Sequence, residues 1–201
     1  DFMITRTFSR LLGLALLLAG LVGCSAMTAQ NPSGSLRPVN AVPAEQGDAL
    51  MLKGADLVAY FTQNQYMQGS STIRSSYQGV TFHFATAEHK ALFDKEPTKY
   101  LPQFGGFCAN GIAYGIPWGG DADTWKMINA KLYIFGGAAS RDAWLLDEAT
   151  NLQRAERYWA DEVAGNNSFW QRTKRLVFRV PHYQSGEQLS QAVAAAKAKK
   201  P

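Results

Sequence analysis

The chain has 201 residues, a formal net charge of +4 at pH 7 and 46% hydrophobic residues. This length fits one domain of ordinary size and argues against an array of several domains. The two cysteines allow at most one intrachain disulfide, which excludes a disulfide-rich scaffold.

The first 23 residues have the pattern of a secretory signal. Arg6 and Arg10 precede an apolar run from Leu11 to Val22. These twelve residues are too few for a membrane-spanning helix, which needs roughly 20, but they suit the apolar region of a signal peptide. The last four residues up to Cys24 read Leu-Val-Gly-Cys and resemble the bacterial lipobox, in which the cysteine is acylated and the chain is cut before it. We therefore predict a lipoprotein signal peptide over residues 1–23 and lipidation at Cys24.

Lipidation at Cys24 limits the remaining sulfur chemistry. It leaves Cys108 without an intrachain partner, as the free thiol of a protein outside the cytoplasm. Residues 24–47 contain three prolines and no aromatic residue, so we expect a flexible tether between the lipid and the domain. Ser25 after the cysteine, rather than Asp, resembles lipoproteins of the outer membrane. The expected location is the bacterial cell envelope, facing the periplasm, at the outer rather than the inner membrane.

Two segments predict β-hairpins. In the first, Val80 to Phe84 alternates apolar and polar residues, and Gln78-Gly79 supplies a turn from a strand that ends at Tyr77. In the second, Trp125 to Ile128 and Leu132 to Phe135 flank a three-residue loop of common length. We expect the two hairpins to share one small antiparallel sheet.

Helices are expected after each hairpin. Thr86 is a good cap for a short helix that turns Leu92 and Phe93 inward, and Pro97 ends that helix or opens a further turn. Ser140 to Val163 carries apolar residues at helical spacing. This segment predicts one long helix that packs on the sheet.

The C-terminal part is basic. An alternating run from Arg172 to Val180 holds four basic residues, and Ser185 with Gln188 predicts a capping box that opens a last helix. The compartment argues against nucleic acid as a partner, so the basic face is either solvated or attracted to anionic lipid headgroups or another envelope polymer. The predicted fold class is α+β, with the domain over residues 48–165 and a basic extension over residues 166–201.

Several segments of the domain together resemble YHS-domain proteins, notably their secreted branch. The segments are Lys53 to Phe61, Tyr77 to His89, Pro97 to Tyr100 and Gln103 to Ala109. The resemblance covers about residues 50–135 and does not explain the residues after about 165. It implies a treble-clef-like core and a metal-handling role, since similar modules occur in copper and heavy-metal transport proteins.

The chain departs from the metal-binding YHS proteins at their cysteines. Ala85 and His89 stand where those proteins carry the two cysteines of an F-C-S-x-x-C-like segment. A structural zinc site needs four nitrogen or sulfur ligands, usually with paired cysteines, so we reject such a site here. A thiolate with an imidazole suits Cu(I), which makes Cys108 with His89 the candidate soft-metal site.

Other interpretations of these residues stay open. His89 could be a solvated residue in the first turn of its helix, and Cys108 could be a buried core residue. Cys108 could also act as a redox or nucleophilic thiol, with His89 as the available base. Asp56 looks like a turn or capping residue. The loop that holds Asp121 and Asp123 lacks the spaced ligands of an EF-hand, so we reject a calcium site there.

The sequence therefore predicts a lipid-anchored envelope protein whose YHS-type domain is a non-catalytic binding module. The expected partners are the membrane, through the lipid at Cys24, and a soft metal ion such as copper at Cys108 and His89. One alternative is an envelope scaffold that binds a protein partner without metal. The other is a thiol redox enzyme that uses Cys108.

Overall fold

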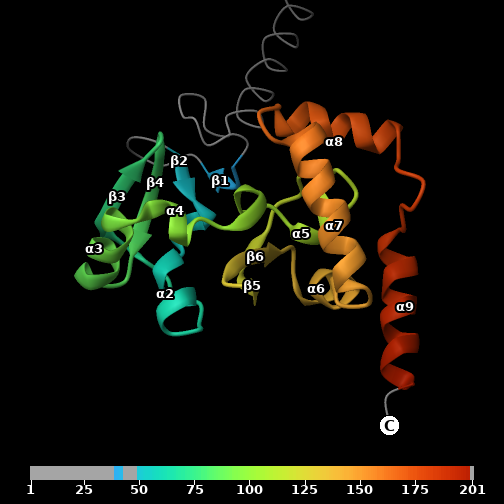
Figure 1. Ribbon diagram of the computed structural model, residues 1–201, viewed down its shortest axis with the longest axis horizontal. Coiled ribbons are helices and arrows are strands. Elements are labelled where there is room, and N and C mark those ends of the chain that lie inside the picture. Colours follow the sequence, from blue (N-terminus) through green and yellow to red (C-terminus); the bar gives the residue numbers. More distant parts are fainter. Residues whose placement is uncertain (1–38, 43–48, 200–201) are drawn as a thin grey trace, which may run out of the picture.

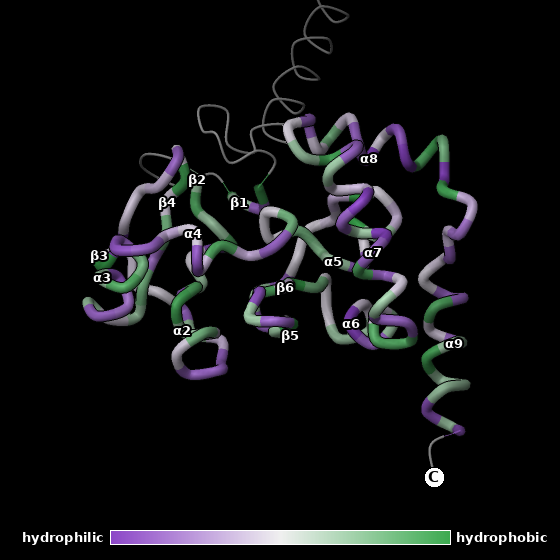
Figure 2. Tube along the Cα trace, viewed as in Figure 1, coloured by the Kyte–Doolittle hydropathy of each residue, from purple (hydrophilic) through white to green (hydrophobic). Residues whose placement is uncertain are grey.

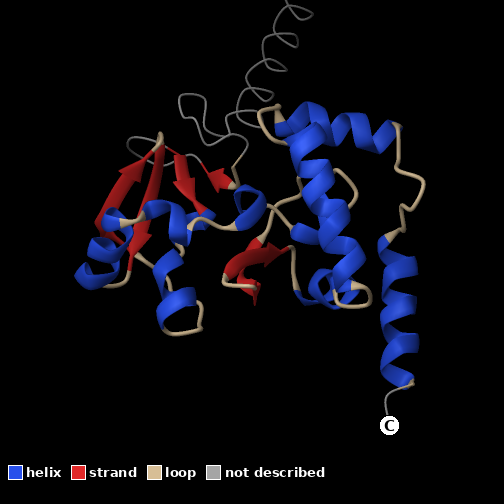
Figure 3. Ribbon diagram, viewed as in Figure 1, coloured by secondary structure: helices blue, strands red, loops and turns tan. Residues whose placement is uncertain are grey.

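The computed structural model describes residues 39–42 and 49–199, and these residues form an α+β fold, as predicted. The larger sheet and its short helices lie on one side of the molecule, and the longer helices lie on the other (Figure 1). A small hairpin lies between them (Figure 3). The predicted signal peptide, the lipidation site Cys24 and most of the predicted tether lie outside the described residues.

The described strands form two separate sheets, of order β1-β2-β4-β3 and β5-β6. Their bounds are β1 Ala41–Val42, β2 Ala49–Met51, β3 Ser70–Tyr77, β4 Val80–Phe84, β5 Asp121–Ile128 and β6 Lys131–Phe135. β2 pairs with β4 in parallel, and the other neighbouring strands pair antiparallel. The larger sheet is therefore mixed.

Both predicted hairpins are present, but the prediction that they share one antiparallel sheet is wrong for the described residues. β4 is paired on both edges, by β3 and by β2, because Ala49 and Leu50 extend alongside it. The second hairpin also turns over two residues rather than three. Asn129 and Ala130 form this turn in the left-handed region, with φ angles of 51° and 57°.

The helices are mostly short, and several begin at side-chain caps. Their bounds are α2 Leu57–Thr62, α3 Ala87–Lys95, α4 Pro97–Tyr100, α5 Ala109–Ile112, α6 Ala138–Trp144, α7 Glu148–Tyr158, α8 Ser168–Val177 and α9 Gly186–Ala198. Two 3-10 turns cover Leu52–Gly54 and Gln103–Gly106, and a π-helical turn over Trp159–Val163 continues α7. Thr86 caps α3 and Pro97 opens α4, as predicted.

The prediction of one helix over Ser140–Val163 is wrong. α6 ends at Trp144, and Asp147 caps a new helix by accepting a hydrogen bond from an amide in the first turn of α7. Leu145, which the helical spacing placed on the buried face, lies in the turn and is 44% exposed. The spacing misleads because α6 and α7 each contribute to the same core, where Trp144 and Ala155 are both fully buried.

β1 and the two residues before it belong to the fold, although the sequence places them in the tether. Val39 and Ala41 are buried, at 2% and 8% exposure. Between them, the Asn40 side-chain amide donates hydrogen bonds of 3.0 Å to the carbonyl oxygens of Gly106 and Gly120. The alternation of apolar and polar residues was the available sequence signal for this short strand.

The first hairpin and α3 share one hydrophobic core. Val80, Phe82 and Phe84 are each at most 1% exposed, as the alternation predicts. α3 turns Phe93 into this core at 1% exposure. Leu92 is instead 40% exposed, so the prediction that both residues point inward is half wrong.

The C-terminal extension packs on the domain through α8. The run from Arg172 to Val180 is helical for most of its length, and the Gln171 side-chain amide donates to the carbonyl oxygen of Gly115 at 2.9 Å. Val180 is buried at 4% exposure. The predicted capping box at the start of α9 is confirmed. No helix among the described residues combines the length and the apolar character needed to cross a bilayer.

Candidate functional site

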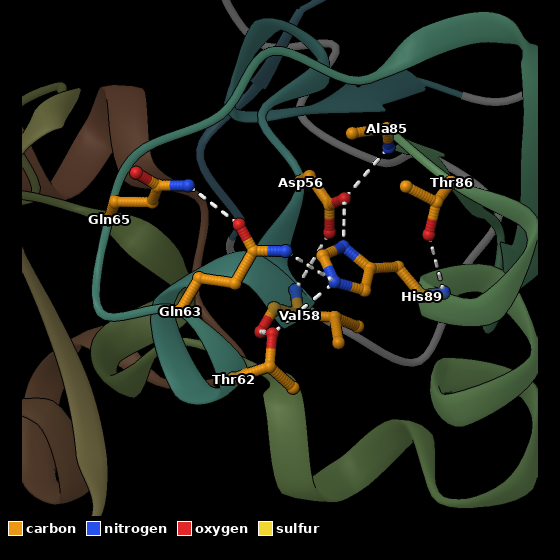
Figure 4. Close-up of polar contacts among 8 residues, drawn as sticks. All are labelled: Asp56, Val58, Thr62, Gln63, Gln65, Ala85, Thr86 and His89. Atoms are coloured by element: carbon orange, nitrogen blue, oxygen red, sulfur yellow. Dashed lines mark hydrogen bonds and ion pairs between the residues drawn. The ribbon is translucent and has the colours of Figure 1, made fainter.

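Asp56 is the centre of a buried polar cluster between α2 and α3. Its side chain is fully buried and caps α2 by accepting a hydrogen bond of 2.9 Å from the Val58 amide. The other carboxylate oxygen accepts from the Ala85 amide at 2.7 Å and lies 2.6 Å from Nδ1 of His89 (Figure 4). The capping role is as predicted. The contacts with Ala85 and His89 join two segments that are distant in the sequence.

His89 is 5% exposed, so the interpretation as a solvated helix residue is wrong. Nδ1 donates to Asp56, and Nε2 lies 3.3 Å from both the Thr62 hydroxyl and the Gln63 side-chain amide (Figure 4). Thr86 fixes this orientation because it caps α3 through the His89 amide. Both ring nitrogens of His89 therefore contact polar side chains at the two ends of α2. These contacts connect α2 to α3.

Cys108 is buried at 2% exposure and caps α5. Its sulfur accepts a hydrogen bond of 3.4 Å from the Gly111 amide and lies 3.1 Å from the Ser140 hydroxyl oxygen. This environment agrees with the interpretation of a packed core thiol.

The structure does not bring Cys108 and His89 to common partners. The imidazole of His89 meets side chains of α2, whereas the thiol of Cys108 meets α5 and α6. α3 and α5 also lie well apart in Figure 1. Within the described residues, no group of three or more His, Cys, Asp or Glu side chains is arranged to hold a metal ion. Soft-metal binding stays a prediction from the sequence.

The burial of Cys108 predicts slow reaction with a thiol reagent. In the chain from residue 24 onward with Cys24→Ser, Cys108 is the single thiol. We expect a water-soluble disulfide reagent to label it at least about tenfold more slowly in the native protein than in urea, since attack requires an accessible thiolate. Absorbance of the released thiolate measures both rates. Equal rates would show that the thiol is presented to solvent.

A cavity of about 310 Å³ opens between the larger sheet and the start of β5. Its lining comes from β1, the first 3-10 turn, the loop before β3 and the start of β5: Asn40, Val42, Leu52, Lys53, Tyr66, Gln68, Gly120, Asp121, Ala122 and Asp123. Small-molecule sites in proteins commonly start at about this volume. The sequence places Asp121 and Asp123 in a loop. No pattern in it predicts that three other segments of the chain lie around them.

Close packing fixes the walls of this cavity. A Cβ atom at Gly120 would lie 2.5 Å from Ile134 Cγ2 and 2.7 Å from the Gly106 carbonyl oxygen, so the backbone can approach this closely only at glycine. On the opposite wall, the Gln68 side-chain amide donates to the Lys53 carbonyl oxygen at 3.0 Å. The Tyr66 hydroxyl donates to Gln68 Oε1 at 2.7 Å.

The charges at the cavity are open to a ligand. Lys53, Asp121 and Asp123 are exposed, and none of the three forms an ion pair with another described residue. The Tyr60 hydroxyl donates to the Ala122 carbonyl oxygen at 2.6 Å and so holds the backbone between the two carboxylates. Burial, with smaller effects from neighbouring groups that include Asp123, raises the pKa of Tyr60, which keeps this hydroxyl protonated as a donor.

No protein-family model matches the chain, and no curated protein or solved structure matches it at a significant level. The resemblance to YHS-domain proteins therefore stays a prediction that depends on the sequence segments that carry it. The cavity at Lys53, Asp121 and Asp123 is the candidate functional site that the geometry supports best.

Proposed function

We propose that the protein is a lipid-anchored, non-catalytic binding module of the bacterial envelope, held at the outer membrane and facing the periplasm. Its ligand is a small molecule that carries both an ammonium and an anionic group, bound in the cavity at the start of β5. The observation that carries this proposal is a preformed cavity lined by Lys53, Asp121 and Asp123, none of which forms an ion pair with another described residue.

The charge pattern favours a zwitterion over a simple ion. A cationic ligand group is attracted to Asp121 and Asp123, while an anionic group is attracted to Lys53. A plain amine would leave the lysine unpaired. A plain carboxylate would meet two like charges.

The reactive side chains outside the cavity support a binding role rather than catalysis. A general base or nucleophile must reach the atom that it attacks. His89 is 5% exposed, and Cys108 is 2% exposed. Their hydrogen bonds hold parts of the chain together, whereas the cavity groups are open to solvent.

Thermal unfolding with matched probes tests the proposed ligand class. The probes are ω-amino acids of increasing length, with the amine and the carboxylate of each length for comparison. We expect an ω-amino acid to raise the unfolding midpoint more than its matched amine or carboxylate. A ligand at one hundred times its Kd stabilises the native state by about 2.7 kcal/mol.

Variants of the cavity charges supply the controls. Lys53→Ala and Asp123→Asn are expected to remove most of this shift. Lys131→Ala and Asp161→Asn change exposed charges outside the cavity lining and should keep it. If amines stabilise the protein as well as ω-amino acids do, the ligand class is wrong. If the shift survives Lys53→Ala and Asp123→Asn, the ligand binds elsewhere.

A further inference from the structure

Large apolar side chains gather in and just after α8. Trp170, Leu176, Val177 and Phe178 are 63–69% exposed, whereas the other exposed large apolar side chains of the described residues reach at most 44%. We call these four side chains the α8 patch. A concentrated, exposed apolar surface of this kind marks an interaction site in a folded protein.

The packing of α8 keeps this patch away from the domain. Gln171 is buried and bonds to Gly115, and Arg175 forms an ion pair with Glu162 of the π-helical turn. These contacts turn one face of α8 inward. Trp170 and Val177, two helical turns apart, lie on another face and stay exposed.

Basic residues accompany the α8 patch in the sequence. No acidic residue lies between Glu162 and Glu187. The basic residues in this interval are Arg172, Lys174, Arg175 and Arg179. Glu162 pairs with Lys174 and Arg175, whereas the other two, Arg172 and Arg179, form no ion pair with a described residue. Arg172 donates a hydrogen bond to the Ser168 carbonyl oxygen, and Arg179 lies over the ring of Tyr183. Hydrophilic and hydrophobic stretches alternate along α8 and the segment after it (Figure 2).

We propose that the α8 patch docks onto the surface of an anionic phospholipid bilayer. Exposed tryptophan and aliphatic side chains beside arginines suit the interface of such a bilayer, where apolar groups enter the headgroup region and arginines meet phosphates. Trp170, Val177 and Phe178 enter the interface, and Arg172 and Arg179 lie at the phosphates. The absence of acidic residues between Glu162 and Glu187 removes the charge that a negative surface would repel.

This inference rests on the proposed lipid anchor, which brings a membrane within reach of the patch. Fourteen residues separate Cys24 from Val39, the first described residue, and they span at most about 50 Å. α8 forms the upper edge of the molecule in Figure 1, and β1, the described strand nearest to Cys24 in the sequence, also lies in the upper half. One membrane can therefore hold the lipid and the α8 patch together.

Vesicle flotation tests the patch without the lipid. The protein is the chain from residue 24 onward with Cys24→Ser, and the vesicles are phosphatidylethanolamine with phosphatidylglycerol, or phosphatidylcholine alone. We expect binding to the anionic vesicles that weakens as salt rises. The double variant Val177→Ser/Phe178→Ser should reduce the partition coefficient by roughly tenfold or more. Serine lacks the favourable free energy that valine and phenylalanine gain on transfer from water into the bilayer interface. Arg172→Gln/Arg179→Gln should reduce it by roughly fivefold per charge and weaken the salt dependence.

A matched variant separates membrane contact from a general loss of apolar surface. Leu145→Ser/Leu146→Ser removes two exposed leucines at the turn between α6 and α7, and its vesicle binding should equal that of the parent chain. All variants should keep the unfolding midpoint of the parent. The proposal is wrong if the parent chain fails to float with anionic vesicles, or if Val177→Ser/Phe178→Ser floats equally well. It is also wrong if the parent dimerises in solution and this variant does not, since the patch would then bind a second copy.

The lipid anchor has its own test, so the two proposals can fail separately. When the precursor is expressed in a bacterium, the parent should stay in the membrane fraction after a high-salt wash, and Cys24→Ser should lose its lipid modification, read by mass spectrometry. An unmodified Cys24 in the parent overturns the anchor and leaves the vesicle result unchanged. A lipidated parent whose unlipidated form does not bind vesicles overturns the docking and leaves the anchor in place.

Discussion

Replacing Asp56 with alanine is expected to lower the free energy of unfolding by about 3–5 kcal/mol, because three hydrogen-bond donors around the buried carboxylate then lose their acceptor. The side chain is fully buried and serves Val58, Ala85 and His89 at once. Alanine leaves two amides and an imidazole nitrogen in a dry interior without an acceptor. Each buried donor without a partner costs about 1–3 kcal/mol.

The exposed carboxylate of Asp94 provides the control for this prediction. Asp94 also accepts hydrogen bonds, from Ser75 and Lys90, but its side chain is 43% exposed. Asp94→Ala should cost about 0.2–1 kcal/mol, because water replaces the lost partners. Urea unfolding followed by circular dichroism measures both changes, with an unchanged slope as the check on two-state behaviour. Similar losses for Asp56→Ala and Asp94→Ala would contradict the structural role of the buried cluster.

Local sequence signals account for the elements that the sequence predicts correctly. The turn at Gln78-Gly79 and the alternation that follows it specify the first hairpin. Thr86, and Ser185 with Gln188, each satisfy amides within their own first turn. These structures depend on neighbours only a few residues away. A single sequence therefore contains the information that they need.

The wrong predictions concern contacts between distant segments. The spacing of apolar residues over Ser140–Val163 does not show whether the chain turns between two helices that share a core, and for this reason it misplaces Leu145. Likewise, the alternation of a strand does not name the strand beside it. β2 occupies the second edge of β4, and this three-residue segment has no clear strand pattern.

The site residues illustrate the same limit. The sequence predicts Asp56 as a turn or capping residue and His89 as a candidate ligand, but the short contact between them depends on how α2 meets α3. The pairing of Cys108 with His89 follows from the ligands that Cu(I) prefers, and the two side chains instead have separate partners. The cavity brings together four stretches of chain, so no local pattern in the sequence could indicate it.

Replacing Phe93 with alanine is the second change with a large expected effect. Phe93 is 1% exposed and lies among the rings of Phe82, Phe84, Tyr77 and Tyr100, with centroid distances from 4.6 to 6.4 Å. Truncation removes the ring contacts and leaves a cavity that the surrounding sheet and helices fill only in part. The expected loss is about 3–5 kcal/mol in the free energy of unfolding.

Leu92 provides the control for this prediction, because it precedes Phe93 on α3 but is 40% exposed. Leu92→Ala keeps the helix propensity high and removes little buried surface, so its cost should stay within about 0.5 kcal/mol. Urea unfolding of both variants at the same pH gives the comparison, and near-ultraviolet circular dichroism reports the aromatic cluster. Equal losses would mean that α3 is rotated from the orientation seen here. Because His89 precedes Phe93 by one helical turn, such a rotation would also break its contact with Asp56.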